Sequence, residues 1–226
     1  MNKGLTTIIV PCYIQTELSK YITMACIGNI TKYTDEEDYE LIVIEDIPKF
    51  KIDDPWHTFR INNHIVLKER TNYATKMNLA VKEANGEYLA FIQNDCFVYE
   101  NWLPTLRWYI ENKYAEAMIP HQFPSAPRKW FKEEPLKTNE ETLSKGVRDA
   151  CMIYMSKEAY DRTGGFNEEL EALVEQDFYE NMNSKGIRYD TTSKVVVTHI
   201  GLATHYQNSH EEFSDAVTHD SLLRNK

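Results

Sequence analysis

The sequence predicts an α/β protein with a mostly parallel central sheet flanked by helices. Two observations predict it. Short, uninterrupted apolar runs alternate with segments of helical period through the first half of the chain, and two of those runs end in polar clusters. Strands covered on both faces are continuously hydrophobic. Their alternation with helices indicates parallel strands joined by right-handed crossovers.

The first half is predicted to hold four strands and two helices. Pro11 closes the first strand, and Thr16 is placed to cap the first helix. Asn85-Gly86 is expected to end the second helix. The predicted strands are residues 6–10, 40–44, 64–67 and 88–92, and the predicted helices are residues 16–32 and 73–84.

The second half is predicted to be less regular. Asn101 is a candidate cap for a helix, and Gly186 is expected to stop a later one. Residues 120–148 carry several prolines and no clear period, which is typical of a functional loop. The other predicted elements are strands 115–119, 150–155 and 194–198, helices 156–162 and 175–185, and a polar tail over about the last 20 residues.

Composition narrows the functional classes. The 226 residues carry a net charge of −10, which argues against general nucleic-acid binding through clustered Lys and Arg. No apolar run reaches the length of a transmembrane segment. The four scattered cysteines indicate buried free thiols in a reducing compartment, so a cytoplasmic location is expected. The length of the chain suggests a single domain over residues 1–226.

Two polar clusters mark a candidate site. Glu45-Asp46 and Gln93-Asn94-Asp95 each follow a predicted strand. Ligands of parallel α/β sheets bind beyond the carboxyl ends of the strands. The sequence therefore predicts a ligand site at this edge, with solvated strand ends as the alternative.

Four motifs in order carry a family resemblance. Together they are similar to the family 2 glycosyltransferases, which have the GT-A fold, from about residue 6 to about residue 205. The motifs are Thr7–Tyr13, which ends in Pro-x-Tyr; Leu41–Asp46, which ends in two acids; Lys76–Asn78 with Asn85–Asp95, which leads into a D-x-D-like motif; and Gly164–Glu168 with Glu175–Asp177 on the acceptor side.

The resemblance implies a nucleotide-diphosphate sugar donor and Mn²⁺ or Mg²⁺. A divalent cation would neutralise charge on the leaving diphosphate. The last acid of D-x-D corresponds to Asp95 as metal ligand, and His199 corresponds to a histidine that reaches the metal or the diphosphate. Gln93 replaces the first acid and is assigned with Asn94 to donor binding. Alternatives are that Asp95 caps a turn and that His199 is structural.

Other donor contacts follow from the same resemblance. Asp46 corresponds to an acid that contacts the base or ribose, and Pro11 and Tyr13 would line the base. Lys76 matches a basic position near the pyrophosphate. A solvated strand end for Asp46, core packing for Tyr13 and a solvated helical lysine for Lys76 are the alternatives.

The acceptor hydroxyl needs a general base. By the same resemblance, Glu175 corresponds to the carboxylate that acts as general base in the family, with Glu in place of the usual Asp. Asp177 is the second candidate for this role. Acids at a helix N-terminus also favour the helix dipole, which is the alternative interpretation of both.

The resulting hypothesis is an inverting, metal-dependent glycosyltransferase. Its donor would be a UDP-sugar, and its acceptor a hydroxyl of a glycan, lipid carrier, protein or modified nucleobase. Donor binding is expected in about residues 1–98, acceptor binding in about 99–205, and the polar tail in about 206–226. The alternatives are a degenerate transferase that only binds a nucleotide sugar or glycan, and a sugar-phosphate nucleotidyltransferase, although no Gly-rich phosphate loop follows Pro11.

Overall fold

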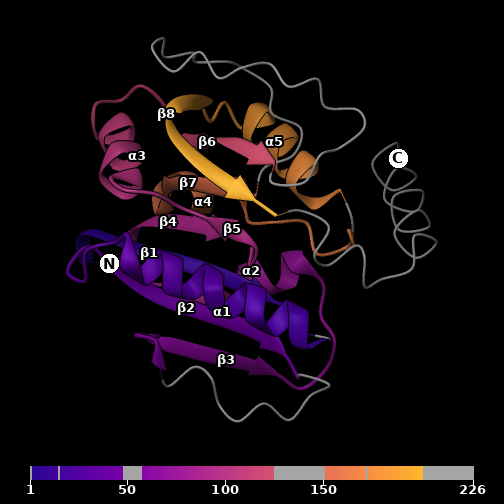
Figure 1. The fold of residues 1–226 in the computed structure, drawn as a ribbon. Coiled ribbons are helices and arrows are strands. Elements are labelled where there is room, and N and C mark those ends of the chain that lie inside the picture. Colours follow the sequence, from indigo (N-terminus) through magenta and orange to yellow (C-terminus); the bar gives the residue numbers. More distant parts are fainter. Residues whose placement is uncertain (1, 15, 48–57, 125–150, 172, 201–226) are drawn as a thin grey trace.

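The computed structural model describes residues 2–14, 16–47, 58–124, 151–171 and 173–200. These residues form eight strands and five helices (Figure 1). The strands are β1 (Asn2–Cys12), β2 (Tyr39–Asp46), β3 (Asn63–Leu67), β4 (Gly86–Ile92), β5 (Cys96–Phe97), β6 (Ala117–Pro124), β7 (Met152–Ser156) and β8 (Tyr189–His199). The helices are α1 (Glu17–Lys32), α2 (Tyr73–Lys82), α3 (Trp102–Glu111), α4 (Lys157–Thr163) and α5 (Val174–Ser184).

The strands form one sheet in the order β3-β2-β1-β4-β7-β6-β8-β5. Neighbours among β3, β2, β1 and β4 are parallel, as are β6 and β8. β7 runs antiparallel to β4 and β6, and β5 runs antiparallel to β8. The predicted α/β class, with a mostly parallel sheet and a small antiparallel element, is confirmed.

The order of strands requires the sheet to curl. β5 follows β4 after only residues 93–95, yet three strands separate the two in the sheet. Four strand spacings in a flat sheet would span about 19 Å, at about 4.8 Å each. The chain from Ile92 to Cys96 reaches at most about 14 Å. The sheet must therefore bend round so that β8 comes back beside the end of β4.

A register shift in β8 contributes to this bend. Pro120 of β6 pairs with Thr192, but the next residue of β6 pairs with Val196. The intervening residues of β8 make a bulge, and a bulge bends its strand and increases the local twist. The last residues of β8 then pair with β5, where Cys96 lies opposite His199.

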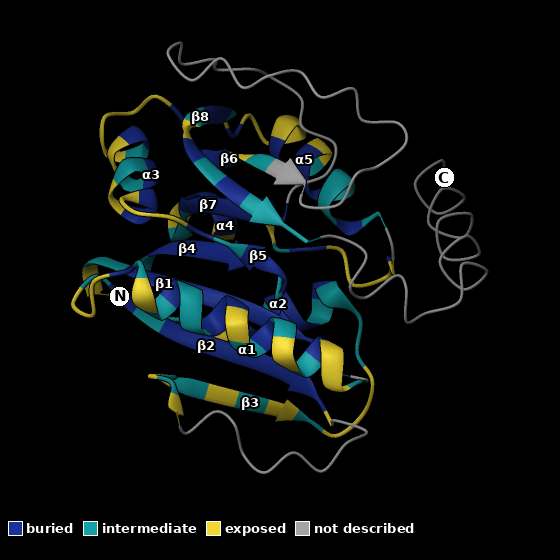
Figure 2. Ribbon diagram, in the orientation of Figure 1, coloured by how far each residue is buried: buried dark blue, intermediate teal, exposed yellow. Residues whose placement is uncertain are grey.

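Alternating side chains in the central strands divide the core between the two faces. Ile8 and Val10 of β1 belong to a cluster with α1 and α3, whereas Ile9 belongs to a cluster with α2, α4 and α5. Both faces are therefore covered, and the central strands are buried along most of their length (Figure 2). Thr16 caps α1 in a capping box with Ser19, as the sequence predicts for the cap.

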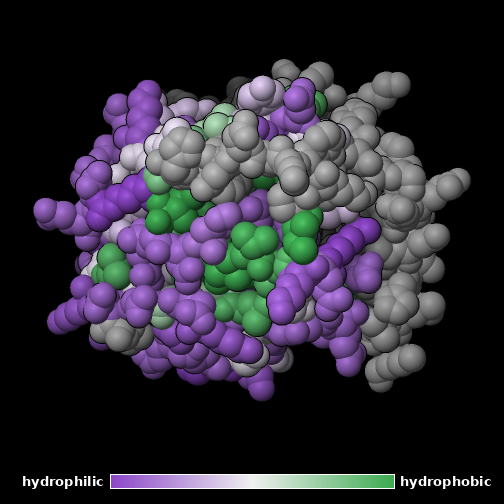
Figure 3. All heavy atoms as spheres, turned by 90° about the horizontal axis from the view of Figure 1, so that it is seen from below, coloured by the Kyte–Doolittle hydropathy of each residue, from purple (hydrophilic) through white to green (hydrophobic). Residues whose placement is uncertain are grey.

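One edge of the sheet stays partly apolar at its surface. β3 forms this edge, where Val66 is 49% exposed, and Ile47 after β2 is 55% exposed. Seen from below, the molecule shows hydrophobic surface surrounded by hydrophilic residues (Figure 3). Among the described residues, no helix has the length and apolar character needed to cross a bilayer.

Several sequence expectations need correction. α2 ends at Lys82, and Gly86 begins β4 instead of capping the helix. Asn101 precedes α3 with φ 60° and makes no side-chain cap hydrogen bond. β6 extends through Pro120 to Pro124, so the predicted loop begins later, and its remainder at 125–148 lies outside the described residues. β8 begins at Tyr189, five residues before the predicted start at Lys194.

The Gly-Gly-Phe segment is fixed to α2 by Asn78. The Asn78 Oδ1 atom accepts from the Phe166 N–H at 2.9 Å and from the Tyr160 hydroxyl at 2.7 Å. Its Nδ2 donates to the Phe166 carbonyl at 2.9 Å and to Glu168 at 2.7 Å. Gly165 is required here because its φ is +95° and a Cβ would lie 2.8 Å from Asn78 Oδ1.

Gly86→Ala tests the packing of β4 against β1. An added Cβ would lie 2.6 Å from the Thr7 backbone nitrogen, so backbone must move. We expect a loss of about 1–3 kcal/mol in the free energy of unfolding, the range for overpacking. Urea denaturation would measure it. Gly28→Ala is the matched control, because its Cβ would meet only the tip of the Phe59 ring at 3.2 Å. Equal stability of the two variants would contradict this account.

Candidate active site

A buried ion pair lies at the carboxyl end of β2. Asp46 Oδ2 accepts from the Lys76 ammonium at 2.6 Å, and both side chains are 5% exposed. Asp46 Oδ1 accepts from the Thr71 N–H at 3.0 Å, just before α2. The same ammonium donates to the Cys12 carbonyl at 3.0 Å. The pair therefore ties the ends of β1 and β2 to the start of α2.

Tyr13 lies beside this pair, directly after β1. Its ring is half-buried, with the Arg70 guanidinium 5.1 Å and the Lys76 ammonium 5.6 Å from its centroid. Pro11 is buried in β1, where it pairs with Ile44 of β2. The structure thus brings Pro11, Tyr13, Asp46 and Lys76 to one edge of the sheet.

Glu45 is the acid next to Asp46, and its side chain points to the opposite face of the sheet. It is buried, and its Oε1 lies 2.7 Å from His64 Nε2 on β3. The sequence did not predict His64 as the partner of Glu45, because the contact depends on how β2 and β3 pair. In this pairing Glu45 lies opposite Val66, and His64 is two residues before Val66 on the same face of β3.

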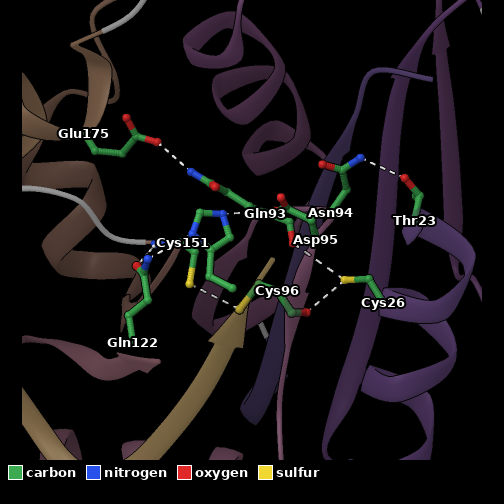
Figure 4. Close-up of polar contacts among 10 residues, drawn as sticks. Thr23, Cys26, Gln93, Asn94, Asp95, Cys96, Gln122, Cys151 and Glu175 are labelled. Atoms are coloured by element: carbon green, nitrogen blue, oxygen red, sulfur yellow. Dashed lines mark hydrogen bonds and ion pairs between the residues drawn. The ribbon is translucent and has the colours of Figure 1, made fainter. Parts of the chain in front are cut away.

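The connection between β4 and β5 is held from three sides. The Gln93 N–H donates to the Cys151 carbonyl at 2.9 Å, and the Cys96 N–H donates back to the Gln93 carbonyl at 3.0 Å. Asn94 Nδ2 donates to Thr23 Oγ1 of α1 at 2.7 Å. Figure 4 shows the contacts of Asn94 with Thr23 and of Cys96 with Cys26, which hold this connection against α1.

Asp95 and His199 are brought together by the curl of the sheet. The Asp95 Oδ1 and His199 Nε2 atoms lie 3.1 Å apart, and the side chains are 6% and 13% exposed. The Ile200 N–H also donates to the Asp95 carbonyl at 3.1 Å. Gln122 Nε2 lies 2.9 Å from His199 Nδ1, which fixes the plane of the imidazole.

The Gln122 amide N–H donates to His199 Nδ1, so His199 Nε2 carries the proton that it donates to Asp95. The 3.1 Å spacing is also that of two ligands of one divalent cation, which would take the place of this proton. Adjacent ligands of an octahedral ion, each about 2.1 Å from it, lie about 3.0 Å apart. Carboxylate and imidazole are both acceptable to Mn²⁺. Within the described residues, no group of three or more His, Cys, Asp or Glu could hold a metal. The remaining ligands of such an ion would be water and phosphate oxygens of a bound nucleotide diphosphate.

Glu175 and Asp177 lie in the first turn of α5. Gln93 Nε2 donates to Glu175 Oε1 at 3.0 Å, so this carboxylate lies beside the D-x-D-like connection (Figure 4). Residues two apart on a helix are about 200° apart around its axis and do not share a face. Asp177 is therefore directed away from the side on which Glu175 meets Gln93.

Buried thiols lie beneath the connection between β4 and β5. Cys26 donates to the Cys96 carbonyl at 3.0 Å, and the Cys96 and Cys151 sulfurs lie 3.3 Å apart. All four cysteines are free and buried, as predicted. Burial raises the pKa of Cys26, and burial with the neighbouring Cys151 raises the pKa of Cys96. The Cys26 and Cys96 thiols therefore stay protonated and serve as packing groups.

Gln122 is a site residue that the sequence did not identify. Its segment has no regular period, and its contact to His199 depends on the parallel pairing of β6 with β8. Arg70 was missed for a similar reason, because its approach to Tyr13 depends on how the chain enters α2.

Lys76→Met tests the buried pair. Removing the ammonium leaves the Asp46 carboxylate buried, and breaking such a pair costs about 3–5 kcal/mol in unfolding free energy. Lys157→Met is the control, because its partner Asp161 is 59% exposed and such a pair contributes about 0.5 kcal/mol. Denaturation at pH 7 measures both, and a small loss in Lys76→Met would contradict the arrangement.

Thiol labelling tests the cysteine environment. A raised thiol pKa lowers the thiolate fraction at pH 8, and the thiolate is the reactive form. We expect at most one equivalent of Ellman's reagent to react with the folded protein, and four after guanidinium is added. Rapid reaction of three or four thiols in the folded state would contradict the burial described here.

Comparison with known proteins identifies the family. The model of glycosyl transferase family 2 matches residues 7–166. Among curated proteins, the search returned no match. Two solved structures of S. aureus TarS 1–349, one without a stated ligand and one with UDP-GlcNAc, share 18% identity and a TM-score of 0.70 with this chain. They cover 90% and 94% of this chain, and 62% and 64% of the solved chains.

A third solved structure has the same fold. It is the mannosyltransferase PcManGT from Pyrobaculum calidifontis in complex with GDP-Man and Mn²⁺, with 14% identity and a TM-score of 0.65. The match covers 86% of this chain and 56% of that one. The chain thus spans less than two thirds of each of these three solved chains. The family match covers most of the sequence, and the chain belongs to glycosyl transferase family 2, with the GT-A fold.

Proposed function

We propose that this protein is an inverting, metal-dependent glycosyltransferase that uses a nucleotide-diphosphate sugar. The observation that carries the proposal is the meeting of three groups around residues 93–95. Asp95 lies 3.1 Å from His199, and Gln93 connects the same three residues to Glu175. A candidate cation site and a candidate base thus lie on either side of one connection.

The donor would lie along the carboxyl ends of β1, β2 and β4. Asp46 and Tyr13 would contact the nucleobase and the ribose of the donor, and the backbone at Pro11 would line the nucleobase. Lys76 is buried and bonded to Asp46, so we assign it to holding that carboxylate in place. Gln93 and Asn94 would contact the donor from the other side.

Asp95 and His199 would hold Mn²⁺ or Mg²⁺. Such an ion, when bound, supplies charge neutralisation at the leaving diphosphate. Glu175 would accept the proton of the acceptor hydroxyl. That oxygen forms the new bond to the anomeric carbon while the bond to the phosphate oxygen breaks, and its electron pair leaves with the nucleotide diphosphate. Attack from the face opposite the leaving group inverts the configuration.

UDP is the proposed nucleotide, on family resemblance. The TarS structure named above contains UDP-GlcNAc, and the mannosyltransferase structure contains GDP-Man with Mn²⁺. Both nucleotides therefore belong in a donor panel. The acceptor would be a hydroxyl of a glycan, a lipid carrier, a protein or a modified nucleobase, and the enzyme would be a hexosyltransferase.

The proposal includes the organisation of the chain and its location. Residues 1–226 would make one catalytic domain, with donor binding in about 1–98 and acceptor binding in about 99–205. The tail at about 206–226 lies outside the described residues. Four free cysteines favour the cytoplasm, because that compartment keeps thiols reduced.

A degenerate transferase without turnover is the second candidate. Gln93 favours it, because a neutral side chain stands where the family motif has an acid. Such a protein would bind UDP or a glycan and release nothing. The nucleotidyltransferase alternative has no supporting contact among the described residues.

A donor panel scored by released nucleotide diphosphate tests the proposal. With Mn²⁺ present, we expect the wild-type protein to release UDP from a UDP-sugar. Asp95→Ala should reduce this activity at least tenfold, since it removes a candidate metal ligand. Glu175→Gln should reduce it by about 10²-fold or more, the usual contribution of a general base.

Asp161→Ala is the control, because Asp161 is exposed on α4 and pairs only with Lys157 among the described residues. Its activity should equal that of the wild type. Tight nucleotide binding without release from any donor would support the degenerate binder instead. Full activity in a folded Asp95→Ala variant would refute the metal assignment.

A further inference from the structure

The side chain of Gln93 has a partner that the family motif does not predict. It stands at the first acidic position of the D-x-D-like motif, and it points across to α5 instead of toward Asp95 (Figure 4). Its Nε2 donates to Glu175 Oε1 at 3.0 Å. The two residues lie 82 positions apart in the chain, so only the folded sheet brings them together.

An ionised carboxylate at position 93 could not donate the hydrogen bond that Gln93 donates to Glu175. An ionised carboxylate only accepts hydrogen bonds, whereas the amide of glutamine both donates and accepts. Two carboxylates at this distance would repel, and one would be forced to bind a proton. Glutamine at this position therefore gives the Glu175 carboxylate a hydrogen-bond donor in place of a second acceptor.

The backbone of Gln93 is fixed before its side chain reaches Glu175. Its N–H donates to Cys151 at 2.9 Å, and its carbonyl accepts from the Cys96 N–H at 3.0 Å and the Cys26 thiol at 3.6 Å. The half-buried side chain leaves from this held backbone. It therefore directs one oxygen of Glu175 with little freedom of its own.

Two tyrosines lie within electrostatic reach of the Glu175 carboxylate. Burial and the charge of Glu175 both raise the pKa of Tyr73 and of Tyr179, so both phenols remain neutral. The Tyr179 hydroxyl is buried and has no hydrogen-bond partner among the described residues. Glu175 is itself half-buried, and a charge-assisted hydrogen bond at such a position is less exposed to competition from water than one at the surface.

We infer that Gln93 is a positioning residue for Glu175, the general base of the proposed reaction. Its Nε2 orients one oxygen of the Glu175 carboxylate. An ionised carboxylate at position 93 could not supply this donor. This inference rests on the proposed function, because it assigns Glu175 as the base of that reaction.

A double-mutant cycle in thermal stability tests the contact without any donor. Gln93→Glu places two carboxylates face to face, so we expect Tm at pH 8 to fall by about 3 °C or more. At pH 4 the fall should shrink, because protonation removes the repulsion. Adding Glu175→Gln should restore most of the lost Tm at pH 8. Strictly additive effects of the two substitutions would overturn the inference.

The pH profile of turnover tests the positioning role. Gln93→Leu removes both hydrogen-bonding groups at similar size, and we expect kcat to fall about tenfold. The acidic limb of the kcat profile should move to higher pH, because an N–H donor favours the ionised form of a carboxylate. Gln93→Asn, which keeps the amide on a shorter arm, should recover part of kcat. In Gln176→Leu, the matched substitution next to Glu175, the limb should stay in place.

An unmoved acidic limb in Gln93→Leu, with wild-type protein active, would overturn the inference and leave the proposed function intact. Absence of turnover by the wild-type protein with every donor would reject the proposed function itself, and the positioning role with it. Coupling in the thermal cycle would then report only a structural contact.

Discussion

The short connection between β4 and β5 is the constraint on which the candidate site depends. Three residues, 93–95, must join strands that lie four positions apart in the order of the sheet. They are too short to cross a flat sheet, so the second half of the sheet bends back toward the first. This bend carries His199, at the end of β8, to within 3.1 Å of Asp95.

A chain of hydrogen bonds crosses the site from the candidate base to the candidate metal ligands. It runs from Glu175 to the Gln93 side chain and from the Gln93 backbone to Cys151. The Cys151 N–H then donates to Gln122 Oε1 at 3.3 Å, and Gln122 contacts His199. Its members come from β6, β8 and α5 and from the residues next to β4 and β7. Small shifts of the curled half would therefore alter the candidate base and the candidate cation site together.

Local features of the sequence predicted much of the fold and the position of acids at the carboxyl ends of two strands. Apolar runs give strands, and Asp46 is the last residue of β2, whereas Asp95 lies three residues after the end of β4. The Gly86 prediction was wrong because a glycine after a helix can also admit a close strand, here Thr7 of β1. The sequence could not reveal Gln122, because its role depends on which distant strands pair.

The net charge of −10 is partly concentrated at this edge of the sheet. Asp46 is offset by Lys76, and Asp95 forms an ion pair with the imidazole of His199. A divalent cation would supply the positive charge that a diphosphate needs beside such carboxylates. The acidic composition is therefore compatible with a phosphate-rich ligand at this one place.

By bringing Asp95 beside His199, the curl of the sheet would make the two side chains ligands of one cation. Pulsed electron paramagnetic resonance of the protein with Mn²⁺ and UDP tests it most directly, since coupling to ¹⁴N reports an imidazole ligand. We predict a nitrogen coupling in the wild-type protein that disappears in His199→Ala, with the Mn²⁺ signal weakened in Asp95→Ala. A bound Mn²⁺ without nitrogen coupling, or a coupling unchanged in His199→Ala, would contradict the account.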